Sequence, residues 1–290
     1  MENIREFGMS EAKAALPKRQ KESNKGSFGK ALIIAGSDAY MGAAHLTLES
    51  ALRGGAGYVG CLNDSRICDS LLMKYPEAIY HRVSLDDITA ALDIARGYSS
   101  VVVGPGLGCS ERVCRLVEAL IVDEGGVLII DADGLNSISR YSGAAIFKER
   151  KREIIITPHP LEFSRLTGVD ASVINAERVD AACSFAKEYG VSVLLKGHGT
   201  VVTDGERVFV NTSGNSALSK GGTGDVLSGL CVSLAASMPD KTLAAILAAF
   251  IHGIAAERES LELSTFGVLP SELPRRIAEV ICRIENAGKM

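Results

Sequence analysis

The chain has 290 residues, of which 47% are hydrophobic and 23% charged, and its formal net charge is −4. This length suffices for a well-buried core, and we expect one domain over residues 1–290, with residues 1–25 as an N-terminal extension that carries a short helix. Basic residues form no broad positive surface, and no apolar run reaches the ~20 residues of a membrane span. We therefore expect neither nucleic acid nor membrane as a partner, while a small anionic ligand stays compatible with the charge.

Seven cysteines are present, an odd number with no CxxC spacing. This pattern favours reduced thiols over disulfides or a zinc site. The first residues also lack an apolar leader segment. We therefore expect a cytoplasmic protein.

The predicted elements begin with the N-terminal helix, which starts at the cap residue Ser10 and ends at Pro17. Short β-rich runs then predict nine strands, at residues 30–35, 57–62, 78–83, 100–103, 127–130, 153–156, 192–195, 200–203 and 207–210. Helical patterns lie between many of them, for example at residues 42–53, 86–95 and 111–122. This alternation predicts an α/β fold in which helices cover both faces of a parallel sheet.

The pattern changes after residue 199. The strands at 200–203 and 207–210 flank an Asp-Gly pair, which predicts an antiparallel hairpin at the edge of the parallel sheet. Three helices follow, at residues 223–236, 242–257 and 272–286, and the second of these is apolar enough to be buried.

One glycine motif predicts only a turn. Residues 55–60 match GxGxxG, which in a dinucleotide-binding unit follows a strand and opens a helix. Here the motif follows a helix and opens a strand. We therefore reject a Rossmann dinucleotide site and expect a tight helix-to-strand turn.

Five other loops follow strands, so a parallel sheet brings them to one edge. Residues 36–44 and 104–108 are glycine-rich, and each is interpreted either as a ligand-binding loop or as a plain turn. His159 is held between two prolines, which favours a ligand contact, and Lys196 lies in a Lys-Gly-x-Gly-Thr turn suited to a phosphate. The Asp131–Asn136 loop, which contains Asp133, leaves two interpretations open: a Mg²⁺ or sugar site, or an aspartate helix cap.

The strongest motif is the run GGTGD at residues 221–225, which leads straight into an apolar helix. A plain helix start would explain Thr223 as a cap and Asp225 as a charge that complements the helix dipole. It would not explain three glycines, which cost conformational entropy. We favour an anion hole made of backbone N–H groups, with Asp225 as the general base beside it.

Taken together, these motifs resemble the ADP/ATP-dependent NAD(P)H-hydrate dehydratases of the ribokinase-like superfamily. The resemblance covers roughly residues 10–286 and rests on KGSFGK at 25–30, GPGLG at 104–108, DADGLN at 131–136, TPH at 157–159, KGHGT at 196–200 and GGTGD at 221–225. It implies a ribokinase-like three-layer α/β/α sandwich with a mostly parallel central sheet. It also implies Mg²⁺, with ADP or ATP as co-substrate, and a homo-oligomer, which we expect to be a tetramer.

The implied reaction is repair of the hydrated cofactors NADHX and NADPHX. Asp225 would accept the proton of the ring hydroxyl while the N–H groups of Gly222, Thr223 and Gly224 stabilise the transferring phosphate. The phosphate ester would then leave, which gives NAD(P)H. The substrate contacts implied are Ala43, Gly106, His159 and Asp225; the nucleotide contacts are Lys196, Gly197, His198, Gly199, Thr200 and Gly224; and Asp133 and Asn136 would hold Mg²⁺ through water.

Two departures from the family pattern concern the site. Leu161 stands where glycine is common, so we expect a different loop beyond His159, and Lys220 would add positive charge at the phosphates. A separate epimerase or spontaneous epimerisation is expected to serve the other epimer. The alternative function is a small-molecule kinase of the same superfamily, acting on an alcohol of a vitamin precursor or sugar. A nucleotide-binding regulator without turnover is the other alternative, and it would not need the base Asp225.

Overall fold

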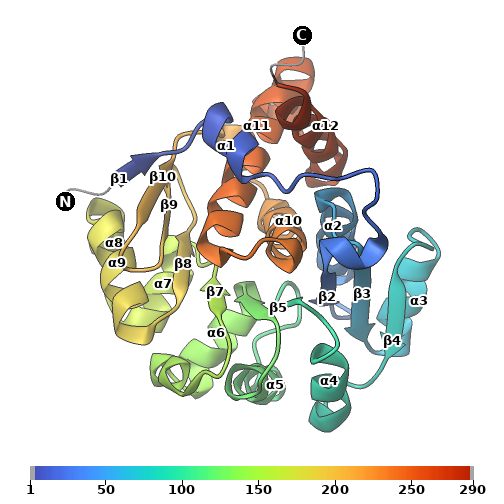
Figure 1. Ribbon diagram of the computed structural model, residues 1–290. Coiled ribbons are helices and arrows are strands. Elements are labelled where there is room, and N and C mark those ends of the chain that lie inside the picture. The colour runs from blue at the N-terminus through green and yellow to red at the C-terminus, as the bar shows by residue number, and fades with distance from the viewer. Residues whose placement is uncertain (1–3, 288–290) are drawn as a thin grey trace.

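The computed structural model describes residues 4–287, and its centre is one ten-stranded sheet (Figure 1). The strand order is β1-β10-β9-β8-β7-β6-β5-β2-β3-β4. Only the β8–β9 and β9–β10 pairs are antiparallel, and the other seven pairs are parallel. The strands are β1 Ile4–Glu6, β2 Lys30–Ile34, β3 Tyr58–Asn63, β4 Ile79–Arg82, β5 Ser100–Val103, β6 Val127–Ile130, β7 Ile154–Ile156, β8 Ser192–Leu195, β9 Thr200–Thr203 and β10 Val208–Asn211.

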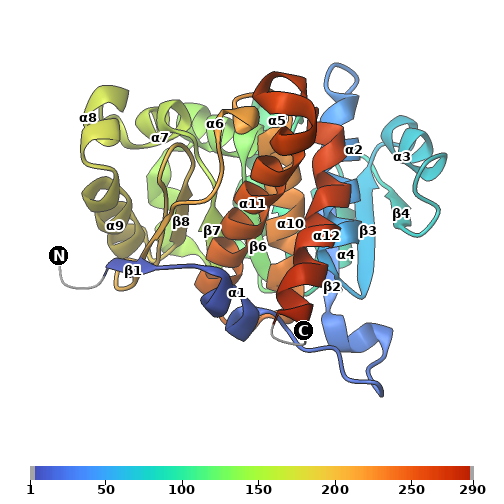
Figure 2. The same cartoon turned by 90° about the horizontal axis from the view of Figure 1, so that it is seen from above.

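Helices cover both faces of this sheet (Figure 2). One layer contains α1 Met9–Ala15, α2 Met41–Gly54, α3 Ser65–Leu72, α10 Thr223–Ser237, α11 Lys241–Gly267 and α12 Leu273–Asn286. The opposite layer contains α4 Ile88–Ala95, α5 Glu111–Val122, α6 Ala132–Tyr141, α7 Pro160–Thr167, α8 Ala171–Ala176 and α9 Arg178–Tyr189. The predicted three-layer, mostly parallel α/β fold is thus confirmed.

The central strands are apolar on both sides because both sides are buried. Ile33 of β2 packs into the core under α2 and α10, while its neighbours Leu32 and Ile34 pack into the opposite core. Ile129 of β6 faces the first core in the same way. The nine predicted strands all occur within one residue of their expected bounds, because short apolar, β-rich runs are a clear signal for strands.

The edge of the sheet differs from the prediction. The hairpin β9–β10 is present, but it does not form the edge, because β1 pairs in parallel with β10 from Ile4↔Val208 to Glu6↔Val210. The prediction of an edge hairpin was therefore wrong. All three β1 residues are exposed, so β1 has no apolar alternation that a sequence pattern could detect.

Helix α10 packs on strands β2, β5 and β6 and lies close to α2. A Cβ on Gly229 would lie 2.1 Å from the carbonyl oxygen of Thr47, so only glycine permits this approach. Twelve residues of α10 are buried. The helix is therefore held firmly, and its N-terminus has a defined position at the carboxyl ends of the parallel strands.

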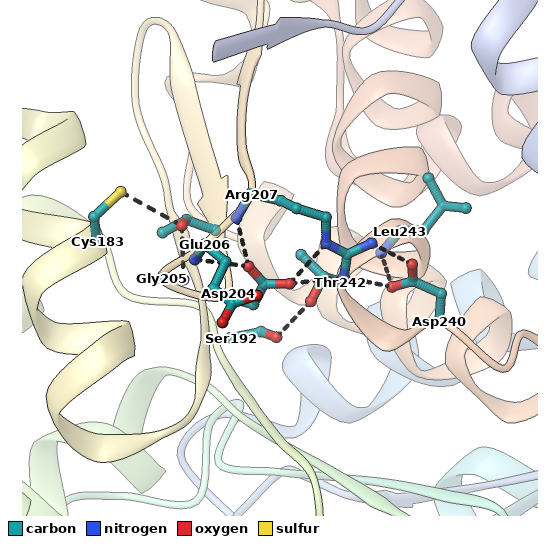
Figure 3. Close-up of polar contacts among 10 residues, drawn as sticks. Cys183, Ser192, Asp204, Gly205, Glu206, Arg207, Asp240, Thr242 and Leu243 are labelled. Atoms are coloured by element: carbon teal, nitrogen blue, oxygen red, sulfur yellow. Dashed lines mark hydrogen bonds and ion pairs between the residues drawn. The ribbon is translucent and has the colours of Figure 1, made fainter. Parts of the chain in front are cut away.

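A polar cluster attaches the β9–β10 hairpin to α11 (Figure 3). The cluster lies at the amino ends of the parallel strands, since Thr203 at the end of β9 pairs with Val193 near the start of β8. Arg207 Nε donates to Asp204 Oδ2 at 2.8 Å, and its Nη2 donates to Asp240 Oδ1 at 3.1 Å. Asp240 also caps α11 by accepting from the N–H of Leu243 at 2.9 Å. The cluster therefore stabilises the fold and lies outside the site described next.

Helix α11 extends beyond the predicted residues 242–257 to Gly267, with non-helical backbone at Ser264. No helix among residues 4–287 combines the length and apolarity that a membrane crossing requires.

Candidate active site

The chemistry-bearing loops meet where the parallel strands end. Strands β2, β5, β6, β7 and β8 are in parallel register, so their carboxyl ends share one edge. Asp131 follows β6, His159 follows β7 by way of two loop residues, and Lys196 follows β8. Helix α10 supplies Asp225 in its first turn. The structure thus brings together these four predicted polar residues.

Asp225 has an unusual acidity. Burial raises the pKa of its carboxyl to about 7, and repulsion from Asp131 adds to this effect. The positive charge of Lys196 acts in the opposite direction but does not cancel the shift. A carboxylate with such a pKa is partly protonated near neutrality and is well matched to proton transfer.

Asp131 is the anchor of the buried network. Its Oδ1 accepts from Lys196 Nζ at 2.7 Å, and its Oδ2 accepts from Ser228 Oγ at 2.7 Å. Its side chain makes no capping hydrogen bond to α6, so the helix-cap interpretation does not describe it. Burial alone would lower the pKa of Lys196. Attraction to the carboxylates of Asp131 and Glu162 is stronger than this effect, so the pKa of Lys196 is raised. Lys196 is therefore a fixed cation at the site.

His159 starts α7 in a rigid arrangement. Its Nδ1 accepts from the N–H groups of Leu161 at 3.1 Å and Glu162 at 3.2 Å, so the proton of the neutral ring is on Nε2. Glu162 in turn accepts the N–H of His159 at 2.8 Å. Leu161 takes part only through its backbone, since its side chain is exposed. The capping box thus fixes the imidazole at the edge of the site.

The turn before α10 provides the predicted anion hole in part. Gly222 has φ 100°, which only glycine adopts easily, and the N–H groups of Gly222, Gly224 and Asp225 donate to no protein oxygen among residues 4–287. The N–H of Thr223 instead donates to the Lys220 carbonyl at 3.3 Å, and its hydroxyl points to the same carbonyl at 2.9 Å. The N–H groups of Gly222, Gly224 and Asp225 are thus available for an anion.

Lys220 does not add charge at this turn. Its Nζ donates to the carbonyl oxygens of Phe266 and Val268, both at 2.6 Å. The ammonium therefore ties the end of α11 to the glycine turn, and the expectation that it faces the phosphates is not met.

A cavity of about 600 Å³ opens beside the turn. Its lining includes all six predicted nucleotide contacts: Lys196, Gly197, His198, Gly199, Thr200 and Gly224. Thr223, predicted as part of the anion hole, also lines the cavity. Sequence reasoning missed the other lining residues, which are Asn211, Thr212, Ser213, Gly214, Asn215, Ser216, Leu218, Ser219, Leu227, Ala249 and His252. The polar run after β10 was the available signal for residues 211–216. His252 gave none, because it lies within an apolar helical pattern.

The predicted substrate contacts Ala43 and Gly106 lie together. A Cβ on Gly106 would lie 2.7 Å from Ala43 Cβ and 2.9 Å from Tyr40 Cβ. The loops are also joined by a hydrogen bond from the Gly36 N–H to the Pro105 carbonyl at 2.8 Å. The two glycine-rich loops thus form one packed wall of the site.

Each of the two predicted Mg²⁺ residues has a protein partner for one of its side-chain oxygens. Asp133 Oδ2 accepts from the N–H of Gly108 at 2.8 Å, and Asn136 Oδ1 accepts from Arg165 Nη1 at 2.9 Å. Within residues 4–287, no three His, Cys, Asp or Glu side chains are grouped as metal ligands. The described residues therefore form no Mg²⁺ site made of protein ligands alone. The second carboxylate oxygen of Asp133 can still bind a water.

Comparison with known proteins identifies the family. The model of a family described as NAD(P)H-hydrate dehydratase matches residues 31–279. The ADP-dependent (S)-NAD(P)H-hydrate dehydratase of Bacillus subtilis is 34% identical over 277 residues, which are 94% of this chain and 96% of that protein. Other curated relatives are bifunctional NAD(P)H-hydrate repair enzymes, and this chain spans about half their length.

Solved structures agree with this result. The ADP/ATP-dependent NAD(P)H-hydrate dehydratase from Bacillus subtilis, co-crystallised with ATP/Mg²⁺, has a TM-score of 0.88 and 32% identity over 98% of this chain and 100% of that chain. A ribokinase-like superfamily protein from Enterococcus faecalis has the same fold, with a TM-score of 0.87 and 21% identity over 98% of this chain and 97% of that one. The chain therefore belongs to the NAD(P)H-hydrate dehydratase family and has a ribokinase-like fold.

Proposed function

We propose that this protein converts the (S)-hydrates of NADH and NADPH back to the reduced cofactors, using ADP or ATP. One observation carries the proposal: Asp225, with a pKa of about 7, lies in the helix turn whose free N–H groups border the nucleotide cavity. A base and an anion hole are therefore side by side, as transfer of a phosphoryl group to a hydroxyl requires.

The reaction divides into two steps. Asp225 removes the proton of the ring hydroxyl while the oxygen attacks the terminal phosphorus, and the bond to the shortened nucleotide breaks. The ring nitrogen then expels inorganic phosphate by breaking the ring C–O bond, and loss of a proton from the adjacent carbon restores NAD(P)H. Negative charge on the transferring group is stabilised by the N–H of Gly224 and by Lys196.

The remaining assignments complete the proposal. Ala43, Gly106 and His159 contact the hydrated ring beside Asp225. The turn at residues 196–200 contacts the nucleotide, which is supported by its place in the lining of the cavity. Mg²⁺ would accompany the nucleotide phosphates and neutralise part of their charge, and Asp133 and Asn136 are the residues that would hold it through water.

Three broader proposals accompany this function. The chain acts as one domain, since both helix layers pack on the same sheet. The seven cysteines are free thiols, which supports a reducing cytoplasmic location. The family resemblance supports a homo-oligomer, and we keep the tetramer as its expected form.

The test is absorbance at 340 nm with NADHX, Mg²⁺ and either ADP or ATP. We expect a rise that requires nucleotide and is lost in Asp225→Asn, while that variant still binds ADP. The alternative, a small-molecule kinase, predicts no rise with either nucleotide and a stable phosphorylated alcohol instead. A binding protein without turnover predicts neither product, and absence of any rise from folded protein that binds nucleotide would disprove the dehydratase proposal.

A further inference from the structure

A second cavity, of about 540 Å³, lies beside the site and is lined by Cys109, Asn136, Ser139, Arg140 and Arg165. It shares no lining residue with the nucleotide cavity. We propose that Arg140 and Arg165 bind the diphosphate of the NAD(P)H hydrate in this cavity. This assignment rests on the proposed function and extends it to the part of the substrate remote from the reacting ring.

The cavity lies along two helices that begin at the active site. On α6, Asp133, Asn136 and Arg140 are spaced by three and four residues and so share one face. On α7, Glu162 and Arg165 continue the face that starts at the cap residue His159. The hydrogen bond from Arg165 to Asn136 at 2.9 Å shows that the two faces meet.

The length of α6 sets the spacing between Asp133, near the proposed ring site, and Arg140. Seven residues separate Asp133 from Arg140, which at the helical rise is about 10 Å along α6. In a dinucleotide, one ribose separates the nicotinamide ring from the diphosphate. A substrate whose ring lies against Gly106 and His159 therefore carries its diphosphate into the cavity, whose wall continues from the same loop through Cys109.

The charges of this cavity are suited to an anion. Neither Arg140 nor Arg165 forms an ion pair with a carboxylate in the described part of the chain, whereas nine of the sixteen other arginines there do. Both residues are exposed, so the guanidinium groups are accessible. Guanidinium forks form paired hydrogen bonds with phosphate oxygens.

The positive charge of Arg165 also reaches the reaction site. Burial lowers the pKa of His159, and the positive charges of Lys196 and Arg165 lower it further. Arg165 is thus close enough to the proposed ring contact to act on the same ligand molecule. The nucleotide cavity, in contrast, is lined by residues that follow β8 and β10 and by the glycine turn before α10.

The experiment compares Arg140→Gln and Arg165→Gln with the matched control Arg275→Gln. Arg275 is an exposed arginine of α12 that lies 3.5 Å from Glu279 and belongs to neither cavity. We expect each cavity variant to raise the KM for NADHX about tenfold, the effect of losing one charge-assisted hydrogen bond. The control is expected to leave this KM unchanged.

Equilibrium binding without nucleotide provides the second readout, with NADH and reduced nicotinamide riboside as the probes. We expect the cavity variants to bind NADH about tenfold more weakly and the riboside, which lacks the diphosphate, as the wild type does. An ADP titration then separates the two anion sites. Equal loss for NADH and riboside, or weaker binding of ADP instead of NADH, would overturn the assignment.

The two proposals fail in different ways. If wild-type protein does not form NADH from NADHX, the proposed function is wrong, whatever the arginine variants do. If the wild type is active and both variants keep the wild-type KM and NADH affinity, the function stands and the arginine subsite is wrong.

Discussion

Lys196 and Asp131 form a buried ion pair with 2.7 Å between Nζ and Oδ1, and both charges act on Asp225. Asp131 raises the pKa of Asp225 and Lys196 lowers it. Since burial of Asp225 adds to the effect of Asp131, the carboxyl titrates near neutrality instead of near 4. In the proposed reaction, the pair thus provides a fixed cation for phosphate and leaves the neighbouring carboxyl basic enough to accept a proton.

The first prediction concerns the pH dependence of the reaction. Only ionised Asp225 accepts the hydroxyl proton, so kcat/KM for NADHX should rise about tenfold per pH unit below 7 and level off above it. Initial rates at 340 nm from pH 5.5 to 8.5 measure this limb, with NADHX stability controlled at each pH. A profile without an acid limb in this range would mean that Asp225 is not the base.

The second prediction concerns stability. The folded-state pKa of Asp225 is about 7 and its ordinary value is 3.8, so the fold holds this proton more tightly than the unfolded chain does. The free energy of unfolding therefore falls as pH rises from about 4 to 7. Asp225→Asn removes the buried charge and should stabilise the protein at pH 8 by on the order of 3 kcal/mol.

Urea unfolding of the wild type and Asp225→Asn at pH 5 and pH 8 checks this result. The difference in unfolding free energy should be larger at pH 8, because the wild-type carboxyl is fully charged there. Asp38→Asn is a matched control, since it changes an exposed acidic residue in the loop that follows β2 at the same end of the sheet. An Asp225→Asn variant less stable than the wild type at pH 8 would contradict the prediction.

Much of the fold follows from local patterns. Strands such as Val127–Ile130 are fully apolar because both faces are covered, and a run of this kind is readable without tertiary information. The edge strand β1 cannot be predicted in this way, because its three residues are exposed and form a strand only by pairing with β10. Local pattern therefore predicts the core of the sheet better than its edge.

The residues of the site also differ in how far the sequence predicts them. Gly222 and Asp225 belong to a continuous motif, so their proximity follows from the sequence alone. The role of Asp131 stayed open, because its partners Lys196 and Ser228 lie 65 and 97 residues away. Arg140 and Arg165 carry no local signal, since exposed arginines on helices are common and only the packing of α6 on α7 places them at one cavity.

The third prediction separates charge from hydrogen bonding at Asp131. Asp131→Asn removes the repulsion that raises the pKa of Asp225 and frees Lys196 to attract it, so both effects shift the acid limb of kcat/KM to lower pH. Ser228→Ala removes one hydrogen bond to Asp131 but no charge and should leave the limb in place. Because Asp131 is buried, thermal unfolding must first establish that each variant is folded. An unchanged limb in folded Asp131→Asn would contradict this account.

The fourth prediction tests the substrate wall. Gly106→Ala places a Cβ 2.7 Å from that of Ala43, and the positive φ of 63° adds strain. The KM for NADHX should rise several-fold while ADP binding stays close to that of the wild type. Gly108→Ala is the control, since its φ of 82° carries similar strain but a Cβ there meets nothing within 4 Å. Equal effects of the two substitutions would show that backbone strain, and not the wall itself, matters.

The last prediction concerns His252, a lining residue of the nucleotide cavity that is only 5% exposed. Its Nε2 has no hydrogen-bond partner in the described part of the protein, and a buried polar atom without a partner is costly unless a ligand satisfies it. Burial, together with the nearby charge of Lys196, lowers the pKa of His252 to about 4, so the ring is neutral at working pH. We therefore expect Nε2 to form a neutral hydrogen bond to the bound nucleotide or its water.

His252→Phe keeps the ring shape but removes this nitrogen, and it should weaken ADP binding about fivefold, the effect of one neutral hydrogen bond. His252→Gln retains a polar group at nearly the same distance and should recover part of the loss. Calorimetric titration with ADP at pH 6 and pH 8 measures both effects, and the ratio of variant to wild-type affinity should be the same at the two pH values because the imidazole does not titrate between them. Wild-type affinity in His252→Phe would show that the nucleotide does not use this nitrogen, while a ratio that changes with pH would show that the bound state protonates it.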